Sequence, residues 1–313
     1  MFSKAIIAAA AASLVAAQRP ADTPICDYYT TALLKENNAT NQYTLLTLLV
    51  NTAVIGNYTQ PNMNAVPGIL NPNATYEGRP VNLVPYFSGG LASTNRNGQA
   101  ASVNFLDGGG AAPLMENKPA NDENSRQYRL LTHLYQYFGA LLGCSEYGNM
   151  GFPAYMGDTG MAEVHRFMAL TADENEYFIQ QVGLSAASFG VTEDDVTAVG
   201  KALTDTFNYR CAPAAAVLPE AEPELQAICQ AEDCPISPNA TCDAYPAVME
   251  PAEATSPASG GNSSMDGSAT MDGSATMSAP AGATSTPASY TGSAAKAAAG
   301  VAAIGGAIFA AFL

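Results

Sequence analysis

Apolar residues recur at three- and four-residue spacing in four separate stretches of the chain, the pattern of amphipathic helices. These stretches cover residues 27–58, 123–144, 171–190 and 192–211. Together they predict a mainly α-helical core over residues 24–212. A chain of this length can bury enough apolar surface to fold on its own.

Residues that favour helix ends place the boundaries of these helices. Asn41 is expected to cap the first helix and Gly56 to end it. Gly143 is expected to end the second helix. Thr171 and Glu174 have the spacing of a capping box, so the third helix is expected to begin there.

Residues 59–121 lack the helical period and are rich in glycine, asparagine and proline. Residues 81–87 and 101–106 are the two pieces expected to be extended. The stretch is too long for an ordinary connection, so it is either functional or a packed, loop-rich insert. Its glycine runs lack the Lys-Ser/Thr of a phosphate-binding loop.

The N-terminal end carries the pattern of a secretory signal peptide over residues 1–17. Lys4 supplies the positive start, an apolar run follows, and small residues occupy the cleavage positions at 15–17. The mature chain is therefore expected to begin at Gln18 and to be extracellular.

The C-terminal end predicts a stalk and an anchor. Residues 250–292 are rich in serine, threonine, alanine and proline, which predicts a disordered, low-complexity stalk. Residues 297–313 are apolar up to the last residue and follow small residues, so residues 293–313 are expected to be a GPI-attachment propeptide. The predicted attachment site is Gly292, which would hold the protein to the membrane through a lipid. A tail-anchored transmembrane helix is the alternative.

The charge balance excludes some partners. The formal net charge is −16 and the sequence pI about 4.3, which argues against binding to nucleic acid or to anionic membrane surfaces. This acidic charge balance is typical of a cell-surface or cell-wall glycoprotein. Five sequons for N-linked glycans fit that interpretation, at Asn38, Asn57, Asn73, Asn239 and Asn262.

Cysteine usage agrees with an oxidising compartment. The even number of cysteines predicts disulfides, with the pairing left open. The last three cysteines in the chain are expected to cross-link an acidic segment over residues 213–249. One of them could instead form a disulfide that joins that segment to the core. The six positions are Cys26, Cys144, Cys211, Cys229, Cys234 and Cys242.

The chain has no GxSxG elbow and no HExxH motif, so neither of these hydrolase chemistries is indicated. His165 is the main candidate for chemistry. Asp158 or Thr159 is expected to cap a short helix that carries it, with Met161 and Met168 on the same face. Two interpretations remain: a core or rim histidine, or an imidazole that binds a metal in an apolar slot. The slot wall would contain Phe138, Leu142, Phe152, Tyr155, Phe178 and Val182.

Four motifs between Tyr137 and Asp195 resemble the truncated haemoglobin family in their order. Residues 137–143 resemble the end of its distal-side helix, and 153–157 its following loop. Residues 161–171 resemble its proximal segment. Residues 189–191 resemble the turn before its final helix.

This resemblance covers residues 129–211 and implies a globin-like core. It also implies a haem whose iron is bound by His165, with Met161 beside the ring. Three features depart from the family: the insert at 59–121, secretion with disulfides, and the lack of a clear distal tyrosine. The distal candidates are Tyr43, Tyr58 and His133.

Two functions follow from the sequence. The first is a GPI-anchored, cell-surface haem protein that binds or reacts with a diatomic gas or peroxide. The second is a structural or adhesive cell-wall glycoprotein without a cofactor, with cell-wall glycans as partners. Whether the protein is an enzyme stays open.

Overall fold

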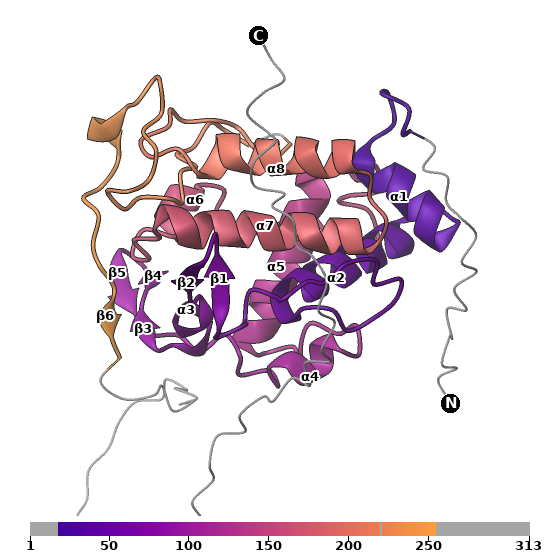
Figure 1. The fold of residues 1–313 in the computed structure, drawn as a ribbon, viewed down its shortest axis with the longest axis horizontal. Coiled ribbons are helices and arrows are strands. Elements are labelled where there is room, and N and C mark those ends of the chain that lie inside the picture. The colour runs from indigo at the N-terminus through magenta and orange to yellow at the C-terminus, as the bar shows by residue number, and fades with distance from the viewer. Residues whose placement is uncertain (1–17, 220, 255–313) are drawn as a thin grey trace, which may run out of the picture. The chain divides into compact units, whose positions relative to one another are not determined.

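The computed structural model describes residues 18–219 and 221–254. The predicted signal peptide, the sequon at Asn262, the attachment site at Gly292 and most of the predicted stalk lie outside the described residues. The described part is mainly α-helical, as the periodicity predicts, with a few short strands (Figure 1).

Helices in two packed pairs make up the core. α2 (Ala39–Ile55) packs against α5 (Arg126–Leu141), and α7 (Ala172–Ser188) packs against α8 (Glu193–Phe207). Contacts between α2 and α7 join the two pairs, and α1 (Ile25–Leu34) packs against α2. The long helices therefore enclose one shared apolar core (Figure 1).

The helix ends differ from the prediction at one important place. The first predicted helix is two helices, α1 and α2, separated at Lys35, whose φ is 72°. The cap of α2 is Asn38, whose Oδ1 accepts the backbone N–H of Asn41 at 3.0 Å. The prediction of Asn41 as the cap is therefore wrong, because Asn41 is the donor of this contact. Gly56 ends α2, as predicted.

The predicted capping box is present at the start of α7. The Thr171 side chain accepts the backbone N–H of Glu174, and the Glu174 carboxylate accepts the N–H of Thr171. α7 ends just before Gly190, whose φ is +86°. Thr192 caps α8 in the same way by accepting the N–H of Asp195.

The loop-rich insert contains short strands and helices rather than long extended pieces. Residues 84–88 form a helix, so the prediction of an extended piece at 81–87 is wrong over most of its length. Its strands form two hairpins near the end of the molecule where α6 leads into α7 (Figure 1). The insert contains β1 (Ala74–Tyr76), β2 (Arg79–Val81), α3 (Val84–Ser88), β3 (Leu91–Ala92), β4 (Thr94–Arg96), β5 (Gln99–Ala101) and α4 (Ala111–Leu114).

Backbone contacts fix the insert to the core. The Gly68 N–H donates to the Gln181 side chain at 2.9 Å, and its carbonyl accepts the Tyr177 hydroxyl at 2.8 Å. The Ile69 N–H donates to the carbonyl of Ala53 at 2.8 Å. The insert is therefore a packed part of the fold, one of the two alternatives that its length allows.

The acidic segment after α8 also packs onto the core. Ala227 and Cys229 are fully buried, and the Ile228 N–H donates to the Phe207 carbonyl at 2.9 Å. β6 (Ala252–Glu253) pairs antiparallel with β3. The predicted stalk boundary at residue 250 is therefore too early, because β6 still belongs to the fold.

All six cysteines form disulfides, as predicted. Cys26–Cys144 ties α1 to the end of α5, and Cys211–Cys242 ties the acidic segment to the end of α8. Cys229–Cys234 closes a short loop, and a 3-10 helix, η1 (Cys242–Ala244), follows. Within the two described ranges, no helix is both long and apolar enough to cross a membrane.

Candidate functional site

The helix that carries His165 is shorter than predicted. α6 spans only Met161–Val164, and His165 is its C-terminal cap residue. Gly160 precedes the helix without a side-chain cap, so neither Asp158 nor Thr159 caps it. The Asp158 carboxylate instead accepts the N–H of Gly160 at 2.9 Å, within a turn.

The His165 ring has one nitrogen engaged and one free. Nδ1 lies 2.8 Å from the carbonyl oxygen of Met161. A carbonyl only accepts, so Nδ1 carries the proton and Nε2 keeps its lone pair. Burial lowers the pKa of His165 against the opposing effect of the Met161 contact, so the ring is neutral at neutral pH. Among the described residues Nε2 has no hydrogen bond.

His165 is half-buried, so part of its surface remains accessible. A neutral, half-buried imidazole with one free ring nitrogen has the properties of a metal- or ligand-binding histidine.

Two distant segments hold α6 in place. The Ala162 N–H donates to the Leu225 carbonyl at 3.0 Å, from the acidic segment. On the other side the Asn95 side chain donates to the Glu163 carbonyl at 2.9 Å, from the insert. Both additions to the helical core therefore position the His165 segment.

A group of aromatic residues connects α5 to the loop before α6. The Tyr155 ring lies edge-on to the rings of His133 and Tyr137, with centroid distances of 5.1 and 5.4 Å. The Tyr137 hydroxyl is buried without a hydrogen-bond partner, and burial raises the pKa of Tyr137. Burial and the nearby Arg129 lower the pKa of His133. An unpaired buried hydroxyl is costly and marks a place where a polar partner would be favourable.

Two of the predicted candidates lie in a second aromatic group. The Tyr43 ring packs against Tyr135 and Phe152 at 5.6 and 5.5 Å between centroids. Phe152 lies so close to Gly139 that a Cβ at that position would come within 2.2 Å of its ring. Burial raises the pKa of Tyr43 to about 12. Tyr43 is therefore a partly buried residue that packs against the core.

Four other predicted wall residues line an apolar cavity of about 60 Å³. His165 is not among its lining residues. Tyr29 and Cys26 of α1 also line it, together with residues of α2 and α8. The structure therefore does not bring the six predicted wall residues around one space. The four that meet in this cavity are Phe138, Leu142, Phe178 and Val182.

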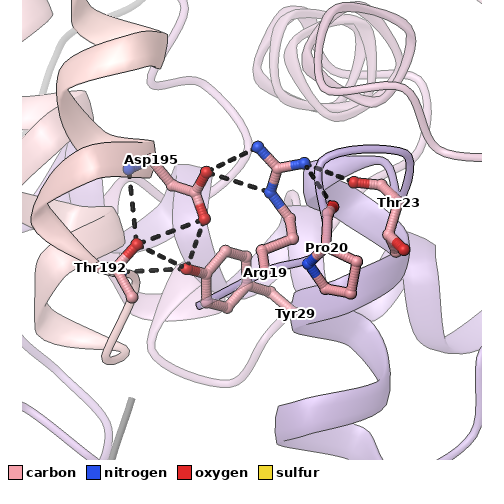
Figure 2. Close-up of polar contacts among 6 residues, drawn as sticks. All are labelled: Arg19, Pro20, Thr23, Tyr29, Thr192 and Asp195. Carbon is pink, nitrogen blue, oxygen red and sulfur yellow. Dashed lines mark hydrogen bonds and ion pairs between the residues drawn. The ribbon is translucent and has the colours of Figure 1, made fainter. Parts of the chain in front are cut away.

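One polar cluster was not predicted (Figure 2). Its Tyr29 also lines the apolar cavity. The Arg19 guanidinium donates to Asp195 Oδ1 through Nη2 at 2.7 Å and Nε at 3.0 Å. The Tyr29 hydroxyl donates to Asp195 Oδ2 at 2.8 Å and accepts the Thr192 N–H at 3.0 Å. We call these four residues the N-terminal cluster.

Burial alone would raise the pKa of Asp195, but the hydrogen bonds from Arg19 and Tyr29 outweigh it and lower the pKa. The cluster therefore joins Arg19, close to the predicted start of the mature chain, to α1 and to the first turn of α8. In the sequence Asp195 suggests only a helix-start acid. Its partners are 176 and 166 residues away, so no local pattern could have indicated them.

Comparisons of the chain with models of known protein families, with curated proteins and with solved structures gave no match. The described residues contain no group of three or more His, Cys, Asp or Glu side chains that could hold a metal ion. A haem iron needs only one protein nitrogen, so this observation does not bear on the haem prediction.

Proposed function

We propose that the described core is a globin-like haem domain in which His165 is the axial ligand of the iron. The observation that carries the proposal is the state of the His165 ring. Its Nδ1–H is held by the Met161 carbonyl, and its Nε2 is unprotonated and free. Histidines that bind metals are commonly oriented by such a contact at the other ring nitrogen.

The donor chemistry fits a haem, and the helix arrangement is compatible with one. Globins also pack their helices in pairs around an apolar pocket. The cavity of about 60 Å³ does not fit, because it is far smaller than ligand pockets of roughly 300 Å³ or more. The proposal therefore assigns the group to the accessible side of His165 and not to this cavity.

A bound haem would supply an iron that can bind a diatomic gas or react with a peroxide. The chain would hold that iron through His165. Tyr137 and His133 of α5, whose rings both contact the Tyr155 ring, would be the candidates for polar contacts with the ligand of the iron.

The proposal places this domain at the cell surface. The signal-peptide pattern, the GPI-attachment pattern and the sequons support it. The three disulfides add support, because they are common in secreted proteins and rare in cytosolic ones.

A haem titration of the folded, secreted protein tests the proposal. We expect one haem per chain and a Soret band. The only two histidines provide a matched pair of variants. His165→Ala should lose the band of the bound form, whereas His133→Ala should keep it. Folded protein that takes up no haem would contradict the proposal.

One observation favours the second candidate, a structural or adhesive glycoprotein without a cofactor. The residues that line the apolar cavity do not include His165, so the helices enclose this space without a contribution from the histidine. Absence of haem uptake in the same titration, with native circular dichroism, would support this candidate.

A further inference from the structure

The sequon at Asn57 differs from the other described sequons in how its side chain is used. Asn57 Oδ1 accepts the Val66 N–H at 2.6 Å, and Nδ2 donates to the Asn64 carbonyl at 3.1 Å. The Asn57 N–H also donates to the Val66 carbonyl at 3.2 Å. The side chain therefore closes the loop over residues 57–66 with both of its polar atoms.

We propose that Asn57 stays unmodified in the folded protein, while Asn73 and Asn239 carry N-linked glycans. The inference rests on the proposed secretory route, because only a chain on that route meets the glycosylation machinery. It goes further by separating the sequons that the sequence pattern alone treats alike.

Glycan attachment would remove the contact that Asn57 makes. In that step Nδ2 loses a proton and bonds to C1 of the sugar. The C1–O bond to a lipid-diphosphate carrier breaks, and the diphosphate leaves. In the planar amide the sugar then takes the position beside Oδ1. The two contacts of Asn57 reach one short stretch, Asn64 and Val66, so we infer that both use this edge of the amide.

Asn73 and Asn239 have no such role. Both residues are exposed, and their side-chain amides have no hydrogen bond within the described ranges. Asn73 lies just before β1, and Asn239 lies in the acidic segment between its disulfide-bonded cysteines. A glycan at either position would extend into solvent without breaking a contact.

Asn38 is also compatible with a glycan. Its Oδ1 caps α2 by accepting the Asn41 N–H, and this oxygen remains available after modification. Its Nδ2 has only a long, exposed contact of 3.4 Å with Glu36. Losing that contact would cost little, because exposed polar pairs contribute little to stability.

Attachment precedes folding, so folding is what selects the modified forms. A chain modified at Asn57 would lose the loop contacts and leave the Asn64 carbonyl without its partner. An unpaired, partly buried carbonyl costs about 1–3 kcal/mol. Chains that fold and are secreted are therefore those in which Asn57 is free.

Peptide mapping of the full chain, secreted from a eukaryotic host, tests this inference. Release of the glycans by peptide-N-glycanase in heavy-oxygen water labels each formerly glycosylated asparagine as aspartate. We expect label at Asn73 and Asn239 and none at Asn57. Label at Asn57 in folded protein would overturn the inference and leave the secretory route standing. A chain that is neither secreted nor labelled anywhere would overturn both.

Two substitutions distinguish the effect of losing the sequon from the effect of losing the Asn57 side chain. Thr59→Ala removes the sequon but keeps Asn57, so the intact mass should differ only by the substitution and the melting temperature should be unchanged. Asn57→Ala should lower the melting temperature without loss of a glycan. Asn73→Gln, as the control, should lower the mass by one glycan. Loss of a glycan in Thr59→Ala would contradict the inference.

Discussion

His165 stays neutral in the folded protein because burial lowers its pKa below the ordinary value of 6.5. The unfolded chain binds a proton at this residue once the pH falls below about 6.5, whereas the folded chain does so only at lower pH. The titration of His165 therefore leaves the free energy of unfolding unchanged well above pH 6.5. As the pH falls below about 6.5, protonation of the unfolded chain at this residue lowers the free energy of unfolding.

We predict that His165→Gln loses less stability than wild type between pH 7 and pH 5.5. Urea unfolding at the two pH values measures this difference. The other titrating groups, including His133, are the same in both proteins, so the comparison isolates His165. Equal losses in the two proteins would show that His165 does not titrate as its burial implies.

Arg19 stabilises Asp195 from the very start of the predicted mature chain. The Asp195 side chain is only 7% exposed and that of Arg19 19%. We predict that Arg19→Ala lowers the free energy of unfolding by about 1–2 kcal/mol, since it removes charge-assisted hydrogen bonds near the surface. The exposed Arg96 has no ion pair among the described residues, so Arg96→Ala is the control, with a change below about 0.5 kcal/mol. Equal effects would argue against the cluster.

At the scale of single residues, the sequence predicts contacts between residues close together in the chain and misses those between distant residues. The Thr171 capping box follows from the three-residue spacing to Glu174. The cap at Asn38 is missed because Asn38 and Asn41 both suit the position. The cluster of Arg19 and Asp195 is missed because nothing local distinguishes a helix-start acid that has a distant partner.

At the scale of elements, periodicity predicts the long helices well, because each presents a continuous apolar face to the core. It fails at α6, where His165 ends the helix and Ala169 has a φ of 47°. It also fails in the insert, whose strands have only two or three residues. Such elements are held by tertiary contacts and leave no period in the sequence.

Two glycines in the insert test whether it is a packed element. Gly68 and Gly78 both have a positive φ, of 90° and 79°. A Cβ at Gly68 would come within 2.4 Å of the Gly56 nitrogen, whereas one at Gly78 would meet nothing within 4 Å.

We predict that Gly78→Ala costs about 1 kcal/mol, from backbone strain alone. Gly68→Ala should cost about 3 kcal/mol or more, because the backbone of α2 must also move. Thermal unfolding followed by circular dichroism measures both. Similar small losses would mean that the insert does not pack as described.

At the scale of the whole molecule, the fold does not end with the last long helix. Residues 213–254 contribute buried side chains at Ala227 and Cys229 and a strand that pairs with β3. The composition of this stretch is acidic and aperiodic, so the sequence places the end of the core too early. Its role depends on contacts with α6 and α8, which no local pattern reveals.

We predict that a chain ending at residue 254 folds cooperatively, whereas a chain ending at 212 does not. The shorter chain exposes the surface that Ala227 covers, and it loses the partner of Cys211. Thermal unfolding and limited proteolysis of both chains check this prediction. A cooperative transition at the same temperature in both would show that the acidic segment is dispensable.

The central claim is that His165 can bind a haem iron through Nε2. The most direct measurement is the absorbance spectrum of haem-supplied His165→Gly protein, recorded with and without free imidazole. The wild-type protein should show the spectrum of a histidine-bound haem. The variant should lose it and regain it when imidazole enters the space left by the side chain. A variant spectrum identical to wild type without imidazole, or a wild-type protein that binds no haem, would contradict the claim.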